Sequence, residues 1–169
     1  AMGQIERLMK AGAHAVKIEG VSGHEDVIAH AIESGVPVMG HLGLTPQSVN
    51  QFGGYKVQGK TDSAKEKIWK DAKTLQELGC FAIVFECVPR DLAKTISADL
   101  DIPVIGIGAG SDVDGQVLVL HDMLGFTTGK KPRFVREYAN GHAILAESVQ
   151  SFLSDVRNGQ FPSLEESYK

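Results

Sequence analysis

The sequence predicts an α/β fold in which a parallel sheet is covered by helices. Short apolar runs suited to strands alternate with longer stretches whose apolar residues recur at helical spacing. The strand-like runs are apolar at nearly every position, which is typical of strands buried on both faces of a parallel sheet. The chain has 169 residues, which is enough for one domain with a sizeable core, and we expect residues 1–169 to form a single domain.

The predicted elements alternate from the start of the chain. A helix under way at residue 4 ends near Gly12, where a left-handed cap is expected. Two stretches have the form of a capping box, residues 22–25 and 63–66, and each predicts the start of a helix. Pro89 fits the first turn of a further helix, and apolar residues from Leu145 to Val156 predict the last one. The predicted strands are residues 13–20, 36–42, 81–87, 102–108 and 117–120, the last of which also fits a helix.

Composition excludes several classes of partner. The formal net charge is -4 and the basic residues are scattered, so we expect neither nucleic acid nor an anionic membrane as a partner. No apolar stretch is long enough to span a bilayer, and the first residues lack the pattern of a signal peptide. Cys80 and Cys87 lack the spacing of zinc ligands and are expected to be free thiols. Cytoplasmic localisation is the resulting expectation.

Polar residues and glycine collect where the predicted strands end, at Glu19, His41, Glu86 and Gly108. In parallel α/β folds, ligands bind at the carboxyl ends of the strands, where loops and helix N-termini meet. We therefore expect a ligand site at this edge. The long glycine-rich loop that follows, residues 43–62, is of a length that is usually functional or disordered.

Lys17 and Glu19 are two residues apart, so both side chains point to the same side of a strand. Inside a closed barrel they would bind, or pair around, an anionic substrate and a cation. On a strand that faces solvent they would form an ordinary ion pair. The spacing alone leaves both interpretations open.

Glu86 ends an apolar strand and has no Lys or Arg within three residues. Burial would raise its pKa, which suits proton transfer near neutral pH. Alternatively, the carboxylate caps the helix that starts near Pro89. His41 is either a donor to a substrate oxygen or a structural histidine whose hydrogen bonds are satisfied within the protein.

The glycines of Gly106-Ile107-Gly108-Ala109-Gly110 do not form a dinucleotide fingerprint, because the third glycine of that motif and its acidic partner are missing. We expect them to let a ligand approach the main chain closely.

Six segments together resemble ketopantoate hydroxymethyltransferase, the family also called 3-methyl-2-oxobutanoate hydroxymethyltransferase. They occur in the family's order and with similar gaps, and the resemblance extends to the tail FPSLEES. The segments are AVKIEG (15–20), PVMGHLGLTPQSVN (37–50), GGYKVQGK (53–60), FECVP (85–89), IPVIGIGAG (102–110) and DGQVLVLHDMLG (114–125).

The resemblance implies a (β/α)8 TIM barrel of the phosphoenolpyruvate mutase/isocitrate lyase type. It implies transfer of a hydroxymethyl group from 5,10-methylenetetrahydrofolate to 3-methyl-2-oxobutanoate, giving 2-dehydropantoate for pantothenate and coenzyme A synthesis. By motif, Lys17 matches the lysine that contacts the oxo acid, Glu19 a carboxylate of the Mg²⁺ site, and Glu86 the catalytic proton acceptor. A large homo-oligomer, a decamer in the family, is also implied.

The chain departs from the family pattern in having five predicted strands, which match the fourth to eighth of the barrel. Two aspartates and a serine that complete the family's metal and substrate sites have no counterpart. We therefore expect the chain to be part of a longer protein, or a piece completed by another chain, and to be inactive alone. Two rival functions are a magnesium-dependent carbon-carbon lyase or mutase of the same barrel group and a non-catalytic barrel fragment.

Overall fold

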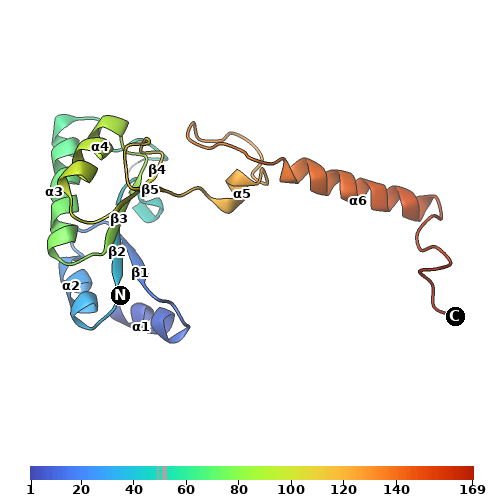
Figure 1. Cartoon of the computed structure of the whole chain (residues 1–169), viewed down its shortest axis with the longest axis horizontal. Helices are drawn as coiled ribbons and strands as arrows, with labels where there is room; N and C mark the ends of the chain where they lie inside the picture. Colours follow the sequence, from blue (N-terminus) through green and yellow to red (C-terminus); the bar gives the residue numbers. More distant parts are fainter. Residues whose placement is uncertain (49, 51–52) are drawn as a thin grey trace. The chain divides into compact units, whose positions relative to one another are not determined.

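The computed structural model of the chain describes residues 1–48, 50 and 53–169 (Figure 1). Contacts within the chain divide it into two compact units, Ala1–Val117 and Leu118–Lys169. Each unit is described by itself below, and the expectation of one domain over residues 1–169 stays a prediction. No helix among the described residues is long and apolar enough to cross a membrane.

The first unit contains the sheet and four of the α-helices, in the alternation that the sequence predicts. The helices are α1 (Met2–Lys10), α2 (Glu25–Glu33), α3 (Asp62–Glu77) and α4 (Arg90–Asp99), with a short 3₁₀ turn, η1 (Pro46–Ser48). The strands are β1 (Val16–Glu19), β2 (Val38–Gly43), β3 (Ala82–Glu86), β4 (Val104–Ile107) and β5 (Gly115–Gln116).

The five strands form one sheet in the order β1-β2-β3-β4-β5, and every neighbouring pair is parallel. The prediction of an α/β fold with a parallel sheet is therefore confirmed. Each new strand is added on the same side of the previous one, without the reversal of order that marks a doubly wound sheet. This arrangement is consistent with part of a barrel.

The two faces of the sheet differ in what covers them. In Figure 1, α2, α3 and α4 lie on one side of the sheet. The strand residues of the main core belong to that side, and they alternate along each strand with residues of the opposite face. The side chains on the helix-covered face are Val16, Ile18, Val38, Leu42, Ile83, Phe85 and Val104. The opposite face therefore receives Lys17, Glu19, His41 and Glu86.

Neither predicted capping box caps its helix. Helix α2 has His24 as its N-cap without a side-chain hydrogen bond, because the Ser22 hydroxyl instead accepts a hydrogen bond from Lys67 at 2.9 Å. Helix α3 begins after Thr61, whose hydroxyl accepts from the Ala64 N–H. Thr61 satisfies a free N–H of the first turn and so fixes the start of α3.

The predicted strand at residues 117–120 is also wrong. The strand that pairs with β4 is β5, two residues earlier, and Leu120 already begins helix α5 (Leu120–Met123). Val117 still donates its N–H to the Gly106 carbonyl oxygen, after which the chain leaves the sheet. Val119 and Leu120 are about half exposed, so this apolar run does not serve as a buried strand.

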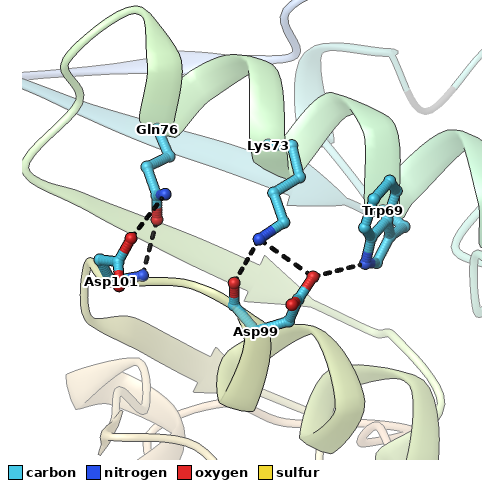
Figure 2. Close-up of polar contacts among 5 residues, drawn as sticks. All are labelled: Trp69, Lys73, Gln76, Asp99 and Asp101. Atoms are coloured by element: carbon cyan, nitrogen blue, oxygen red, sulfur yellow. Dashed lines mark hydrogen bonds and ion pairs between the residues drawn. The ribbon is translucent and has the colours of Figure 1, made fainter.

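Helix α3 is fastened to the end of α4 and to the connection that follows it by a row of polar side chains (Figure 2). The indole N–H of Trp69 donates to Asp99 at 3.0 Å, and Lys73 contacts both the carboxylate and the carbonyl of Asp99. One turn further on, Gln76 exchanges two hydrogen bonds with Asp101, at 3.1 and 2.7 Å. These contacts hold α3 against the end of α4 and the connection that leads to β4.

The second unit contains α5 and the long helix α6 (Gly141–Arg157), which confirms the helix predicted around residues 145–156. Asn140 caps α6, because its side-chain oxygen accepts from the Ala143 N–H. Apolar residues of α6 stay about half exposed, among them Leu145, Val149 and Phe152.

Replacing Gln76 by Ala should lower the free energy of unfolding by about 1 to 2 kcal/mol, because two hydrogen bonds between α3 and the α4–β4 connection are lost. Urea denaturation of the chain measures this. The matched control is Glu77→Ala on the same helix, where the side chain is exposed, and it should leave stability nearly unchanged. Equal effects of the two variants would contradict the fastening role of Gln76.

Candidate active site

Strand register brings the four polar side chains of the face opposite α2, α3 and α4 to one end of the sheet. Glu19 is the register partner of His41 on the neighbouring strand, and Glu86 is the partner of Gly43. Lys17 lies one alternate position before Glu19 on the same face. The structure therefore brings Lys17, Glu19 and Glu86 into one group, as the sequence predicts, with His41 between the two carboxylates.

His41 is almost fully buried, with 1% of its surface exposed. Its Nε2 lies 3.2 Å from the Glu86 Oε2, and its Nδ1 lies 3.9 Å from the Glu19 Oε1. Neither nitrogen makes a hydrogen bond of acceptable geometry to a described residue. A structural histidine with its hydrogen bonds satisfied is thus not what the described residues form, and both ring nitrogens are buried without a hydrogen-bond partner among them.

Burial lowers the pKa of His41 from 6.5 to about 4, and the positive charge of Lys17 acts in the same direction, while the charge of Glu19 opposes it. The imidazole is therefore neutral at neutral pH. Its short approach to Glu86 is a contact between a neutral ring and a carboxylate, and not an ion pair.

Glu86 is half-buried at the end of β3, and burial raises its pKa above the usual 4.5. The charge of Lys17 works against this rise, and the charge of Glu19 adds to it. The alternative role as a helix cap is not observed, because α4 has Pro89 as its N-cap and no side-chain cap. Pro89 therefore lies one residue outside the helix in whose first turn it was expected.

Glu19 is held by the main chain of the following loop. The N–H of Gln47, in η1, donates to Glu19 Oε2 at 3.0 Å, which leaves Oε1 on the side of His41. Lys17 is exposed and makes no ion pair within the described part of the chain, so the proposed simple pair with Glu19 is not formed there. Its charge nevertheless acts on both His41 and Glu86.

A cavity of about 350 Å³ opens beside Glu19, between the β1–α2 connection, the loop after β2 and the first half of α3. Glu19, Gly43, Gln58 and Lys67 are among its lining residues, whereas His41 and Glu86 are not. Glu19 therefore borders both the cavity and the polar group on the sheet. Residues 49, 51 and 52 of the same loop lie outside the described residues, and the function of residues 43–62 stays a prediction.

Gly106 in β4 and Gly110 after it have close neighbours within the chain, and the expected approach of a ligand to the main chain here stays a prediction. A Cβ at Gly110 would lie 2.4 Å from Arg90 Cγ, and a Cβ at Gly106 would lie 3.0 Å from Val113 Cγ2. The close approach to these glycines is thus made by the chain's own side chains.

The described residues contain no cluster of three or more His, Cys, Asp or Glu side chains arranged to hold a metal ion. Mg²⁺ needs about six oxygen ligands in octahedral order, and Glu19 supplies one carboxylate. The residues of this chain alone therefore do not fit a complete magnesium site.

Comparison with known proteins places this site in context. A model of the family described as "Ketopantoate hydroxymethyltransferase" matches residues 1–164. Proteins named 3-methyl-2-oxobutanoate hydroxymethyltransferase are 55% identical in Bdellovibrio bacteriovorus and 48% in Francisella tularensis, each over 167 residues and 99% of this chain. One from Legionella pneumophila is 52% identical over 97% of the chain. The chain spans 63 to 64% of the length of these relatives.

The lowered pKa of His41 predicts a pH dependence of stability. The unfolded chain takes up a proton near pH 6.5 and the folded chain only near pH 4, so stability is lost as the pH falls through this window. From about pH 7.5 to about pH 5 the loss should be about 2 kcal/mol. Urea denaturation at the two pH values measures it, and His41→Asn should remove most of the difference. The same pH dependence in both proteins would contradict a buried neutral imidazole.

Proposed function

Because the chain belongs to the ketopantoate hydroxymethyltransferase family, we propose that its residues serve the transfer of a hydroxymethyl group to 3-methyl-2-oxobutanoate, giving 2-dehydropantoate for pantothenate and coenzyme A synthesis. The one-carbon donor in this proposal is 5,10-methylenetetrahydrofolate. The observation that supports it is the convergence of a lysine, a neutral histidine and two carboxylates at the carboxyl end of parallel strands.

Lys17 is the residue that we assign to the oxo acid. The substrate carries a carboxylate and a keto oxygen, both of which gain from a nearby positive charge, and more so as negative charge develops on the keto oxygen during enolisation. The exposed ammonium of Lys17 lies on the face shared by Glu19 and Glu86. A ligand above that face can thus contact Lys17 directly.

Glu86 is the proposed proton acceptor. Forming a carbon-carbon bond at C3 of the oxo acid requires removal of the proton on that carbon. A carboxylate whose pKa is raised by burial holds a proton better than an exposed one and is closer to the pKa that suits general base catalysis. The nearby charge of Lys17 limits this rise, which keeps Glu86 able to release the proton afterwards.

His41 is the proposed hydrogen-bond donor to a substrate oxygen. It is neutral, buried and without an accepted hydrogen bond among the described residues, so a bound oxygen would satisfy one ring nitrogen. A neutral donor is suited to an oxygen that gains negative charge and does not add a second positive charge beside Lys17.

Mg²⁺ is the proposed ion, with Glu19 as one of its ligands. When bound, such an ion acts as a Lewis acid toward the keto oxygen. Since one carboxylate is not a complete site, the remaining ligands in this proposal come from outside the described residues.

A (β/α)8 barrel of the phosphoenolpyruvate mutase/isocitrate lyase type is the proposed architecture of the active protein, with this chain as its fourth to eighth strands. The sequential, all-parallel strand order supports it. A cytoplasmic homo-oligomer, a decamer by family resemblance, completes the proposal.

A complementation experiment tests the function. The part of the Bdellovibrio bacteriovorus relative that the match does not cover is fused to this chain, and the fusion is assayed with 3-methyl-2-oxobutanoate and methylenetetrahydrofolate. Formation of 2-dehydropantoate is expected from the fusion and not from the chain alone. A folded fusion that cleaves or rearranges oxo acids without folate would favour the lyase or mutase function, and one inactive in every assay would favour a non-catalytic role.

Replacing Glu86 by Gln in the active fusion should lower kcat by about 100-fold or more, because the amide cannot accept the proton. Activity of the unaltered fusion should fall with decreasing pH through an apparent pKa above 4.5, since the raised pKa of Glu86 keeps it protonated there. Glu33→Gln, an exposed change at the end of α2, is the control. An unchanged rate in the Glu86 variant would refute its assigned role.

Replacing Lys17 by Met should lower kcat/KM for the oxo acid by about tenfold or more, with a higher KM and also a lower kcat, because a charge-assisted contact that strengthens during enolisation is lost. Steady-state kinetics of the fusion measure both constants. A purely structural contribution of Lys17 would leave KM unchanged.

A further inference from the structure

One short segment, residues 43–48, begins with the last residue of β2 and contacts both strands that present the carboxylates. The main-chain N–H of Leu44 donates to the carbonyl oxygen of Glu86 at 2.8 Å. Three residues later, the main-chain N–H of Gln47 donates to the side chain of Glu19 at 3.0 Å. The same six residues are therefore bonded to the ends of β1 and β3, on either side of β2.

Gly43 permits the first of these contacts. Its φ is +91°, a conformation that residues with a Cβ rarely adopt. A Cβ at this position would lie 2.2 Å from the Glu86 carbonyl oxygen and 2.6 Å from Val88 Cγ2. The end of β2 can therefore approach β3 this closely only with glycine at position 43.

Pro46 and the turn that follows orient the second contact. Pro46 opens η1 with a fixed φ, and the Ser48 N–H closes the turn on the Thr45 carbonyl oxygen at 2.9 Å. The Gln47 N–H lies in the first turn of η1, where main-chain donors have no partner within the helix. It is directed instead to Glu19 Oε2, so that only Oε1 remains on the side of His41.

We propose that residues 43–48 are a positioning segment for the reaction, in which the main-chain N–H of Gln47 fixes the orientation of the Glu19 carboxylate relative to Glu86. This inference rests on the function proposed above. Leu44 holds the main chain of Glu86 and Gln47 holds the side chain of Glu19, so two residues of one segment tie the Glu19 carboxylate to the end of β3. A carboxylate held by one oxygen presents the other in a fixed direction, which is the condition for precise substrate placement.

Hydrogen exchange tests the contact without reference to activity. The Gln47 amide should exchange about tenfold or more slowly than an unprotected loop amide, since its hydrogen bond to the Glu19 carboxylate must open before exchange. Glu19→Ala should remove this protection, Glu19→Gln should restore part of it, and Gln47→Ala, which keeps the N–H, should retain it. Fast exchange in the unaltered chain, or protection that survives Glu19→Ala, would overturn the proposal.

Kinetics then test the positioning role in the active fusion. Gln47→Ala is compared with its ester analogue. In the analogue, lactic acid at position 47 replaces the main-chain N–H by an oxygen atom and leaves the methyl side chain the same. We expect kcat/KM for the oxo acid to fall about tenfold in the ester, mainly through KM, because Glu19 is the residue assigned to the ion that contacts the oxo acid. The thermal midpoint should fall as well, because the hydrogen bond is lost, but a merely structural contact would lower the midpoint and leave KM unchanged.

The two experiments separate failure of this inference from failure of the proposed function. Protection of the Gln47 amide that depends on Glu19, in a fusion without hydroxymethyl transfer, would keep the contact and refute the function. Transfer activity with equal kinetic constants for Gln47→Ala and its ester analogue would support the proposed function and refute the positioning role.

Discussion

The candidate site depends on the register of three parallel strands. A strand turns alternate side chains to opposite faces, so a slip of one residue would exchange the two sets completely. With the observed register, Ile18, Leu42 and Phe85 are packed under the helices, while Glu19, His41 and Glu86 lie on the opposite face. The apolar core and the polar site are thus fixed by the same pairing, and neither can shift without the other.

The electrostatics of the site follow from unequal burial along this face. His41 is the most buried of the four groups, and it is neutral because no carboxylate is placed well enough to offset the loss of hydration. A charged imidazole would pair with both carboxylates and make them weaker proton acceptors. With His41 neutral, the positive charge at this end of the sheet comes from Lys17, which is exposed and therefore open to an anionic substrate.

Sequence patterns predicted the sheet and the three charged residues of the site because both depend on alternation along strands. Lys17 and Glu19 share a face by spacing, and Glu86 ends an apolar run, so their placement at one edge follows from parallel pairing. The failures were local. Ser22 looked like a helix cap, but its hydroxyl binds Lys67, 45 residues away. The run at 117–120 looked like a strand, but pairing with β4 is confined to Gly115 and Gln116.

The contacts of residues 43–48 could not have been predicted in this way, because their donors belong to the main chain. A main-chain N–H is present in every residue except proline, so the identity of Leu44 or Gln47 says nothing about the bond it makes. The sequence signals are the residues that shape the path, Gly43 at a left-handed position and Pro46 at the start of η1. Since orientation by the main chain tolerates any side chain at position 47, the constraint falls on Gly43, where an added methyl group would meet the Glu86 carbonyl oxygen. The loop's main-chain geometry, and not its exposed side chains, therefore connects the Glu19 carboxylate with the end of β3.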